Sequence, residues 1–389
     1  MHAEIITIGS EILLGEIVDT NSGAIAKKLQ TIGMPLFYTS TVGDNLERMV
    51  AAIRQGLARS DVVITTGGVG PTVDDLTREA VAQAVGKPLV FDDGLLAQIE
   101  QRFKRWGRTM TDNNRQQAFR PEGSLAIENP VGTAPCFIVE QDGRVVISLP
   151  GVPREMDYLM DHSVLPFLRQ RFKLTGIIKS RALKVSGVGE SQVDAQVGDL
   201  ERLENPTVGL NAHSGIVVIR ITATASNEDE ADGLIAPIEA SVRERLGNLV
   251  FGSDGETLEG SVLAELSLRG ETLTVVESGT GGRLACKLSL SEQGKAGFVV
   301  GKITTQAEST DLVELARLTA AQAQADWGLA CVVEESGGEI QLGVGLWNAD
   351  IRQQWRRGFG GHPALVPEWS ANVALDTLKR ALSAANEKE

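Results

Sequence analysis

Cysteine and histidine are scarce in this chain of 389 residues. The three cysteines, Cys136, Cys286 and Cys331, lie far apart without any Cys-x-x-Cys pair, and there are only four histidines. Disulfide frameworks and zinc sites both need several suitably spaced cysteine or histidine residues. The composition therefore supports neither, and we expect the cysteines to be buried thiols in a reducing cytosol.

Long apolar runs and clusters of basic residues are also lacking. No run reaches membrane length, and the N-terminus leads directly into an expected strand, Glu4–Ile8, without a basic leader segment. The formal net charge of -14 and the pI near 4.9 argue against nucleic acids and anionic membrane surfaces as partners. We expect a soluble, cytoplasmic protein that binds a small molecule.

Glycines, hydroxyls and carboxylates are concentrated in one segment, Thr65–Asp75. The run before it, Asp61–Ile64, is apolar and β-branched, which is typical of a parallel strand buried on both faces. Thr72 with Asp75 three residues later is a capping-box signature, so we expect a helix to begin at this loop. Glycines let the backbone approach a ligand closely, and the N–H groups of a first helical turn attract anions.

The two aspartates of this segment complicate the binding of an anion. Asp74 and Asp75 would repel a bare phosphate, but they could hold a divalent cation such as Mg²⁺, which bridges carboxylates and phosphate oxygens. They could instead accept hydrogen bonds from a base or a pterin ring. The simplest alternative is that the glycines make a tight turn and the aspartates cap a helix. We favour a ligand site because simple turns seldom combine so many of these residue types.

Strand and helix patterns alternate through residues 1–170, and they predict an α/β fold. We expect a three-layer sandwich with a mainly parallel sheet between helices. Ligands bind beyond the carboxyl ends of such strands, where Ser10, Asp44 and the glycine segment would converge. A later strand, Val145–Leu149, leads into the stiff turn Pro150–Pro153 at the same edge.

Two further domains are expected, a small α+β domain at 176–252 and an α/β domain at 253–389. The alternation of apolar residues over 217–223 indicates a sheet with one solvated face. The last domain has a second glycine-rich junction, Glu277–Gly282, but no histidine or carboxylate pair follows it to activate Ser278.

Several strings of residues resemble the CinA (competence/damage-inducible protein) family in order and spacing: Glu4–Gly15, Asp19–Asn21, Val42–Asn45, Thr65–Asp75, Asn129–Pro135, Leu149–Pro153, Gly187–Gln192 and Asn205–Leu210. The resemblance implies that domain 1–170 has the fold of the molybdenum-cofactor proteins MoaB and MogA, that the middle domain is a linker domain, and that the protein is a homodimer. It also implies metal-dependent hydrolysis of ADP-ribose to AMP and ribose 5-phosphate.

The last domain is similar to the family's nicotinamide-mononucleotide deamidase domain, but it departs at the catalytic motifs. Gly279 replaces a cysteine, Lys295 aligns with the serine nucleophile, and Thr305–Thr310 replaces a run with a tyrosine and a lysine. Val332–Gly338 stands where the family has a substrate loop. Catalytic groups act as a unit, so we expect this domain to be catalytically degenerate and to serve in structure or at an interface.

Our hypothesis is a metal-dependent pyrophosphohydrolase that cleaves ADP-ribose or a related nucleotide diphosphate. Its cofactor would be Mg²⁺ or Co²⁺, with K⁺ as a candidate accessory ion. The proposed catalytic and metal-binding residues are Asp44, Asp74 and Asp75. The proposed substrate-binding residues are Ser10, Asn21, Thr66, Gly67, Gly68, Gly70, Pro71, Thr72, Asn114, Pro150, Gly151 and Pro153. The alternatives are a non-catalytic module that binds a pterin or nucleotide, and an amidase in the last domain, which the lost motifs disfavour.

Overall fold

A computed structural model describes residues 1–292, 297–305 and 311–386 of the chain. These residues divide into two compact units. The first consists of Met1–Lys179 and Thr224–Ala231, and the second of Ser180–Ala223 and Asp232–Glu389.

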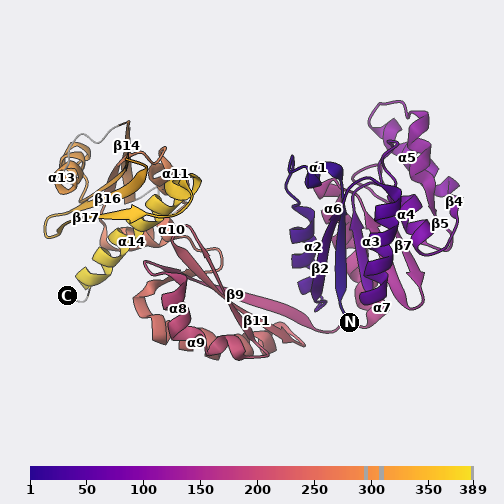
Figure 1. Cartoon of the computed structure of the whole chain (residues 1–389), viewed down its shortest axis with the longest axis horizontal. Coiled ribbons are helices and arrows are strands. Elements are labelled where there is room, and N and C mark those ends of the chain that lie inside the picture. The colour runs from indigo at the N-terminus through magenta and orange to yellow at the C-terminus, as the bar shows by residue number, and fades with distance from the viewer. Residues whose placement is uncertain (293–296, 306–310, 387–389) are drawn as a thin grey trace. The chain divides into compact units, whose positions relative to one another are not determined.

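The first unit is built on a six-stranded sheet with the order β2-β1-β3-β8-β7-β6 (Figure 1). Its parallel strands are β1 (Ala3–Ile8), β2 (Leu36–Val42), β3 (Val62–Thr66) and β8 (Arg144–Leu149). Its antiparallel strands are β7 (Cys136–Gln141) and β6 (Leu125–Ile127). The prediction of a mainly parallel sheet is confirmed.

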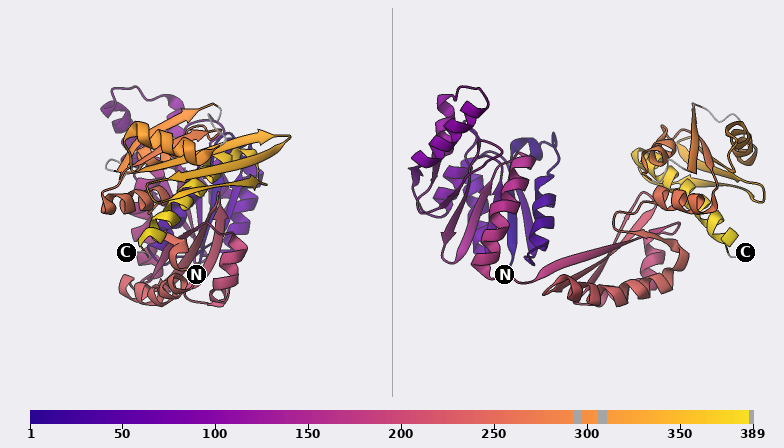
Figure 2. Two further views of the ribbon diagram at one scale, coloured as in Figure 1. Left: turned by 90° about the vertical axis from the view of Figure 1, so that its left-hand side faces the viewer. Right: turned by 180° about the vertical axis from the view of Figure 1, so that it is seen from behind.

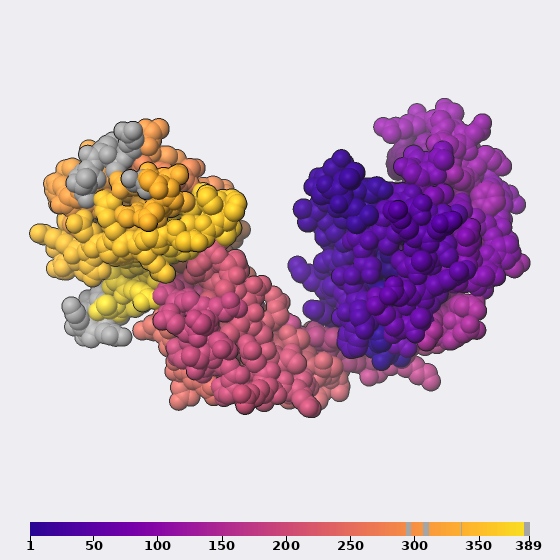
Figure 3. All heavy atoms as spheres, in the orientation of Figure 1, coloured from indigo at the N-terminus to yellow at the C-terminus, as the bar shows by residue number. Residues whose placement is uncertain are grey.

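Helices cover both faces of this sheet, as Figures 1 and 2 show. Successive strand residues point to opposite faces, so Ile5 and Ile64 enter one core while Ile6 and Val63 enter the other. The covering helices are α2 (Asn21–Gln30) and α6 (Pro153–Leu159) on one face and α3 (Leu46–Arg59) and α4 (Thr77–Ala84) on the other. In Figure 3 the atoms of this part form one closely packed body. The predicted three-layer sandwich is therefore confirmed.

Further elements complete the first unit. They are α1 (Ser10–Leu13), α5 (Asp93–Arg105), the 3-10 helix η1 (Asp112–Ala118), the strand pair β4 (Leu89–Phe91) and β5 (Phe119–Pro121), the π-helical turn η2 (Met160–Val164) and α7 (Leu165–Phe172).

The helix after the glycine segment begins later than predicted. Helix α4 begins at Thr77, and its N-cap residue Leu76 makes no side-chain cap bond. Thr77 is itself tied to the preceding loop, because its hydroxyl donates to the carbonyl of Gly67 at 2.8 Å and its N–H to that of Gly68 at 3.0 Å. The capping prediction for Thr72 and Asp75 was therefore wrong, and both residues belong to the loop.

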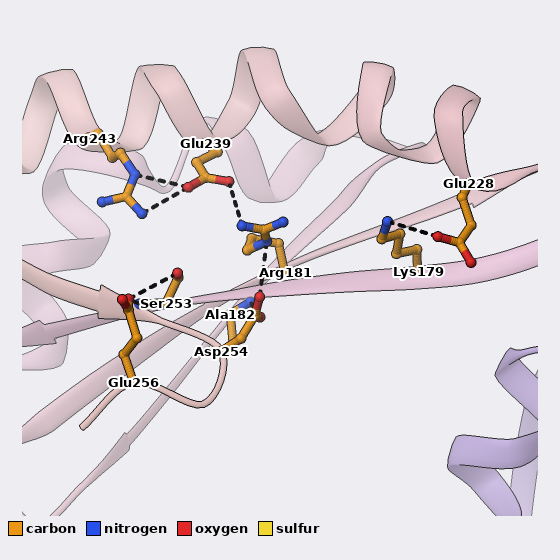
Figure 4. Close-up of polar contacts among 9 residues, drawn as sticks. All are labelled: Lys179, Arg181, Ala182, Glu228, Glu239, Arg243, Ser253, Asp254 and Glu256. Atoms are coloured by element: carbon orange, nitrogen blue, oxygen red, sulfur yellow. Dashed lines mark hydrogen bonds and ion pairs between the residues drawn. The ribbon is translucent and has the colours of Figure 1, made fainter. Parts of the chain in front are cut away.

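Most of a four-stranded sheet with the order β10-β11-β9-β12 belongs to the second unit. Its elements are β9 (Ile177–Ser186), α8 (Glu190–Val197), β10 (Thr207–His213), β11 (Ile216–Ala225), α9 (Glu228–Leu246) and β12 (Val250–Ser253). Figure 4 shows Arg181 of β9 between Glu239 of α9 and Asp254. Its guanidinium lies 3.6 Å from the Glu239 carboxylate and 3.1 Å from that of Asp254, so one side chain connects the helix to the sheet.

The second unit also contains a five-stranded sheet with the order β14-β13-β15-β16-β17. Its strands are β13 (Leu273–Ser278), β14 (Phe298–Thr304), β15 (Trp327–Ser336), β16 (Glu339–Trp347) and β17 (Arg352–Phe359). Its helices are α10 (Leu258–Arg269), α11 (Arg283–Leu290), α13 (Leu312–Ala323) and α14 (Val366–Asn386). β14, β13 and β15 are parallel, so this part has the predicted α/β character.

Candidate functional site

A cavity of about 480 Å³ lies at the carboxyl ends of the parallel strands of the first unit. It is lined by residues that follow β1, β2, β3 and β8, where the sequence predicted a site. The predicted site residues in its wall are Asn21, Asp44, Thr66, Gly67, Gly68, Gly70, Pro71, Thr72, Asp74, Asp75, Pro150, Gly151 and Pro153. Two residues proposed to bind substrate, Ser10 and Asn114, are not among the described residues that line the cavity. Each of them forms a hydrogen bond with a residue that does line it, Ser10 with Asp44 and Asn114 with Gln117.

The glycine loop over 67–75 needs glycine where the backbone crosses the end of β1. Gly67 has φ of +106°, and a Cβ there would lie 2.2 Å from the carbonyl oxygen of Ile8. A side chain would therefore meet backbone atoms that cannot move independently. The N–H of Gly67 donates to the carbonyl of Leu149 at 3.0 Å, which joins the loop to the end of β8.

Arg78 lies buried beneath the same loop, with 2% of its surface exposed. Its guanidinium donates to the carbonyls of Val69 at 2.6 Å, Gly70 at 3.0 Å and Asp75 at 3.2 Å. Burial lowers the pKa of Arg78, but a guanidinium remains charged at neutral pH. Arg78 therefore fixes the path of the loop and places a positive charge behind it.

Asp44 is held in the wall by a reciprocal pair of hydrogen bonds with Ser10. The N–H of Ser10 donates to Oδ2 of Asp44 at 2.8 Å, and the N–H of Asp44 donates to the Ser10 hydroxyl at 3.1 Å. The two residues follow β1 and β2, which are neighbours in the sheet. Ser10 thus positions Asp44.

Asp74 and Asp75 share the side chain of Thr72. The Thr72 hydroxyl lies within hydrogen-bond distance of Oδ1 of Asp74, and 2.6 Å from Oδ2 of Asp75. The N–H of Thr72 also donates to Oδ2 of Asp75 at 2.8 Å. The hydrogen bond from Thr72 lowers the pKa of Asp74, so its carboxylate stays ionised well below neutral pH.

The 3-10 helix η1 supports the other side of the loop. The side chain of Asn113 donates to the carbonyl of Pro71 at 3.2 Å, and that of Gln116 to the carbonyl of Thr72 at 2.8 Å. The next residue, Gln117, lines the cavity and is 1% exposed. Asn114 donates to Oε1 of Gln117 at 3.1 Å, so it contacts the wall indirectly, through Gln117.

Asn21 joins three segments at the floor of the cavity. Its Nδ2 donates to the hydroxyl of Thr66 at 3.0 Å and to the carbonyl of Gly151 at 2.9 Å. The Thr66 hydroxyl in turn donates to the carbonyl of Pro150 at 3.0 Å. Helix α2, the end of β3 and the Pro150 turn are therefore held together at this point.

Three carboxyl residues of the wall, Glu11, Asp19 and Glu155, were not predicted as site residues. Burial raises the pKa of Glu155, although Asn129 donates to its Oε2 at 2.5 Å. Burial would also raise the pKa of Asp19, but hydrogen bonds from Ser22 and Thr7 outweigh it and lower the value. Because burial raises its pKa, Glu155 is a candidate for proton exchange, and its place just after Pro153 was the available sequence signal.

Six carboxyl side chains line the cavity: Glu11, Asp19, Asp44, Asp74, Asp75 and Glu155. Within the described part of the chain, no lysine, arginine or histidine joins them in the wall. An anionic ligand would be repelled by this wall unless cations entered with it. The cavity is therefore suited to a ligand accompanied by metal ions, or to an uncharged ligand that donates hydrogen bonds.

The predicted metal ligands fit an ion that keeps part of its own water shell. Asp44 and Asp75 each accept the hydrogen bonds described above through Oδ2, and Asp74 does so through Oδ1, so these bonds leave the other oxygen of each carboxylate unused. Residues 1–292, 297–305 and 311–386 contain no ready-made group of three or more metal-binding side chains. Mg²⁺ commonly binds through one or two carboxylates plus water and substrate phosphates, and the wall offers that kind of site.

The second glycine-rich junction lies at the end of β13. Glu277 there is fully buried and accepts hydrogen bonds from the Thr280 hydroxyl and from the N–H groups of Leu284 and Ala285, so it holds the start of α11. Gly279 has φ of +72°, and a Cβ there would lie 2.3 Å from the carbonyl oxygen of Val333. This backbone has no room for the cysteine of the deamidase motif.

Other deamidase positions lie partly outside the described residues. Lys295 and residues 306–310 are among those that the structure does not describe.

Among the described helices, none is both long and apolar enough to cross a bilayer.

Two family models match the chain. Residues 4–170 match the model described as "Probable molybdopterin binding domain", and residues 180–252 match the "Damage-inducible protein CinA KH domain". The first match confirms the predicted MoaB/MogA-like fold of the N-terminal region.

Homologues extend this likeness along the chain. A CinA-like protein from Kosmotoga olearia is 36% identical over 412 residues, which cover 98% of this chain and 99% of that protein. A homologue named competence-damage inducible protein from Halothermothrix orenii is 42% identical over 303 residues, covering 78% of this chain and 73% of its own. The crystal structure of CinA, of unknown function, from Thermoplasma acidophilum is 38% identical with a TM-score of 0.40, covering 44% of this chain and 97% of that one.

Proposed function

We propose that the N-terminal domain of this chain, which belongs to the CinA family, is a metal-dependent pyrophosphohydrolase. Its proposed substrate is ADP-ribose or a closely related nucleotide diphosphate, and its products are AMP and ribose 5-phosphate. The family resemblance is the source of this reaction, and the cavity at the glycine loop supports it.

The observation that carries the proposal is the acidic wall around a loop suited to phosphate. The carbonyl of Val69 accepts a hydrogen bond from buried Arg78. In a trans peptide the C=O and the following N–H point in opposite directions, so the N–H of Gly70 points away from Arg78. We assign this N–H to a diphosphate oxygen. Six carboxyl groups would otherwise repel that anion, so the diphosphate binds together with a divalent ion.

The aspartates are the residues that would hold this ion. When bound by Asp44, Asp74 and Asp75, Mg²⁺ or Co²⁺ would neutralise the diphosphate and lower the pKa of a water molecule. Ser10 keeps the Asp44 carboxylate in place, and Thr72 does the same for Asp74 and Asp75. Supporting residues of this kind orient metal ligands.

Glu155 is the proposed proton acceptor. The oxygen of water forms a bond to one phosphorus, the bond from that phosphorus to the bridging oxygen breaks, and AMP and ribose 5-phosphate leave. The proton released by water passes to the Glu155 carboxylate. Its pKa, raised by burial, brings its proton affinity closer to that needed at neutral pH.

A second candidate function is the binding of a pterin without catalysis. The matched family model describes a molybdopterin-binding domain, and the wall carboxylates could accept hydrogen bonds from the N–H groups of a pterin ring. This candidate predicts tight pterin binding and no turnover of ADP-ribose.

Cytoplasmic location, homodimerisation and an accessory role for K⁺ remain parts of the proposal that come from the sequence and the family resemblance. Size-exclusion chromatography with light scattering would measure the oligomeric state. Activity assays in which Na⁺ replaces K⁺ would measure the effect of K⁺.

The test is to incubate the full chain with ADP-ribose and, separately, with nicotinamide mononucleotide, each with and without Mg²⁺ or Co²⁺. AMP and ribose 5-phosphate that appear only with metal would support the hydrolase. ADP-ribose binding without turnover under every metal condition would refute it. Release of ammonia from nicotinamide mononucleotide would instead reveal an amidase in the last domain.

A further inference from the structure

Two buried amide side chains in the cavity wall each have one polar atom without a hydrogen-bond partner in the described chain. Oδ1 of Asn21 is an unpaired acceptor, and Nε2 of Gln117 is an unpaired donor. Asn21 is 7% exposed and Gln117 is 1% exposed, and both line the cavity. Burying a polar atom without a hydrogen-bond partner costs free energy, so we expect a ligand or a water molecule to bind each of these two atoms.

The orientation of Asn21 follows from its other hydrogen bonds, and that of Gln117 is the one in which the Thr111 hydroxyl acts as a donor to Asn114. Nδ2 of Asn21 faces the carbonyl of Gly151, which can only accept, so the unpaired atom must be the oxygen. The Thr111 hydroxyl donates to Oδ1 of Asn114 at 2.9 Å, and in this arrangement Nδ2 of Asn114 donates to Oε1 of Gln117. The nitrogen of Gln117 is then the atom left for the ligand.

We propose that Gln117 and Asn21 recognise the uncharged, hydroxyl-bearing part of the ligand, and that Asn114 positions Gln117 for this contact. This inference rests on the proposed function and specifies its substrate class. An acceptor at Asn21 requires a donor on the ligand, such as a sugar hydroxyl, and Gln117 requires an acceptor, such as a hydroxyl or ring oxygen. Ionised diphosphate offers acceptors but no donors, so it cannot satisfy both amides.

The site therefore selects a diphosphate attached to sugar or nucleoside groups over inorganic pyrophosphate. The acidic wall with its metal would bind the diphosphate group, which ADP-ribose and inorganic pyrophosphate share. The two amides would bind only the sugar or nucleoside groups, which inorganic pyrophosphate lacks. Sites that hydrogen-bond a substrate group reject analogues without it, because the buried amides then stay unpaired.

The test compares the affinity of the full chain for ADP-ribose and for inorganic pyrophosphate, each with Mg²⁺, by calorimetry. Binding can be measured without turnover when the titrations are short or when Ca²⁺ replaces Mg²⁺. We expect Q117M to weaken ADP-ribose binding about fivefold to tenfold, as for one lost hydrogen bond, and to leave pyrophosphate binding unchanged. Q101M is the matched control, since Gln101 is an exposed residue of α5 outside the cavity wall.

Asn114 supplies a second test through a double-mutant cycle. In N114D the donor to Oε1 of Gln117 is lost, so Gln117 turns its nitrogen toward the new carboxylate and presents its oxygen to the ligand. We expect N114D to weaken ADP-ribose binding in the wild type and to have no further effect in Q117M, because the two residues act on one contact.

Three results with the variants would overturn the inference: equal loss of affinity for both ligands in Q117M, no loss for either, or additive effects of N114D and Q117M. These outcomes are distinct from failure of the proposed function. Selective ADP-ribose binding without AMP formation would refute the hydrolase and leave the assignment of Gln117 standing. If the wild-type chain does not prefer ADP-ribose to pyrophosphate, the assignment itself is wrong.

Discussion

Arg78 is the cationic side chain that donates to the carbonyls of the glycine loop, and replacing it by methionine removes that charge. Methionine keeps most of the side-chain volume but leaves the carbonyls of Val69, Gly70 and Asp75 without their donor. Hydrogen bonds from a charged donor contribute about 1.5–3 kcal/mol each. Part of that gain is offset because the buried charge no longer has to be desolvated.

We therefore expect R78M to destabilise the closed loop by about 2–4 kcal/mol relative to an open one. At 1.4 kcal/mol for each factor of ten, exchange of the loop amides with deuterium should accelerate by roughly 30-fold or more. The informative amides are those of Thr72 and Thr77, whose hydrogen bonds lie within the loop. Hydrogen–deuterium exchange with mass spectrometry measures this directly.

R78K should give an intermediate rate, because lysine keeps the charge but lacks the planar fork that reaches several carbonyls. The matched control is R105M, since Arg105 is exposed near the end of α5. If R78M exchanged the loop amides at the wild-type rate and bound ADP-ribose equally well, the guanidinium would not be what holds the loop.

The remaining predictions concern the carboxylates and the second glycine junction. The raised pKa of Glu155 keeps its carboxyl group protonated, and unable to accept a proton, over a wider acidic range, so the rate of AMP formation should fall as the pH drops through that pKa. E155Q should be slow at all pH values. If E155Q showed the same fall in rate at acidic pH as the wild type, Glu155 would not be the proton acceptor. G70A should raise the Mg²⁺ concentration needed for half-maximal activity, because the new Cβ would lie 2.5 Å from Oδ2 of Asp75; an unchanged requirement would count against Asp75 as a ligand. G279C should release no ammonia from nicotinamide mononucleotide, since its Cβ would meet the Val333 carbonyl, and detectable release would contradict this reasoning.

The layered fold and the place of the candidate cavity were predictable because they depend on short-range patterns. Apolar strands alternating with amphipathic helices dictate a parallel sheet, and a parallel sheet brings its loops to one edge. Asp44 and the glycine loop were placed in one cavity by this rule alone. The order of strands and helices along the chain was enough to make this prediction.

The start of α4 could not be predicted from its local signature. Thr72 and Asp75 form the same side-chain to backbone bond in a loop as in a helix cap. What delays the helix is the contact of Arg78 with the loop carbonyls and that of Thr77 with Gly67 and Gly68, and these contacts exist only after the loop has folded.

The roles of Gln117 and Asn114 depend on the fold of η1. Both residues lie in one polar stretch, and the sequence cannot tell which amide faces the cavity. The structure places Asn114 behind Gln117 through a single hydrogen bond. Glu155 was missed for a different reason, because its pKa is raised by burial, and the sequence alone does not show which carboxyl groups the fold buries.

The most direct test of the central claim is the Mg²⁺ dependence of AMP formation from ADP-ribose in D75N. Asparagine keeps an oxygen to accept the hydrogen bonds from Thr72 but loses the charge that would hold the ion. D112N is the control, since Asp112 is exposed in η1 and lies outside the cavity wall. We predict that D75N requires at least about tenfold more Mg²⁺ for half-maximal activity, as expected when one carboxylate ligand loses its charge, while D112N behaves as wild type. AMP formation that D75N carries out with the wild-type Mg²⁺ requirement would contradict the account.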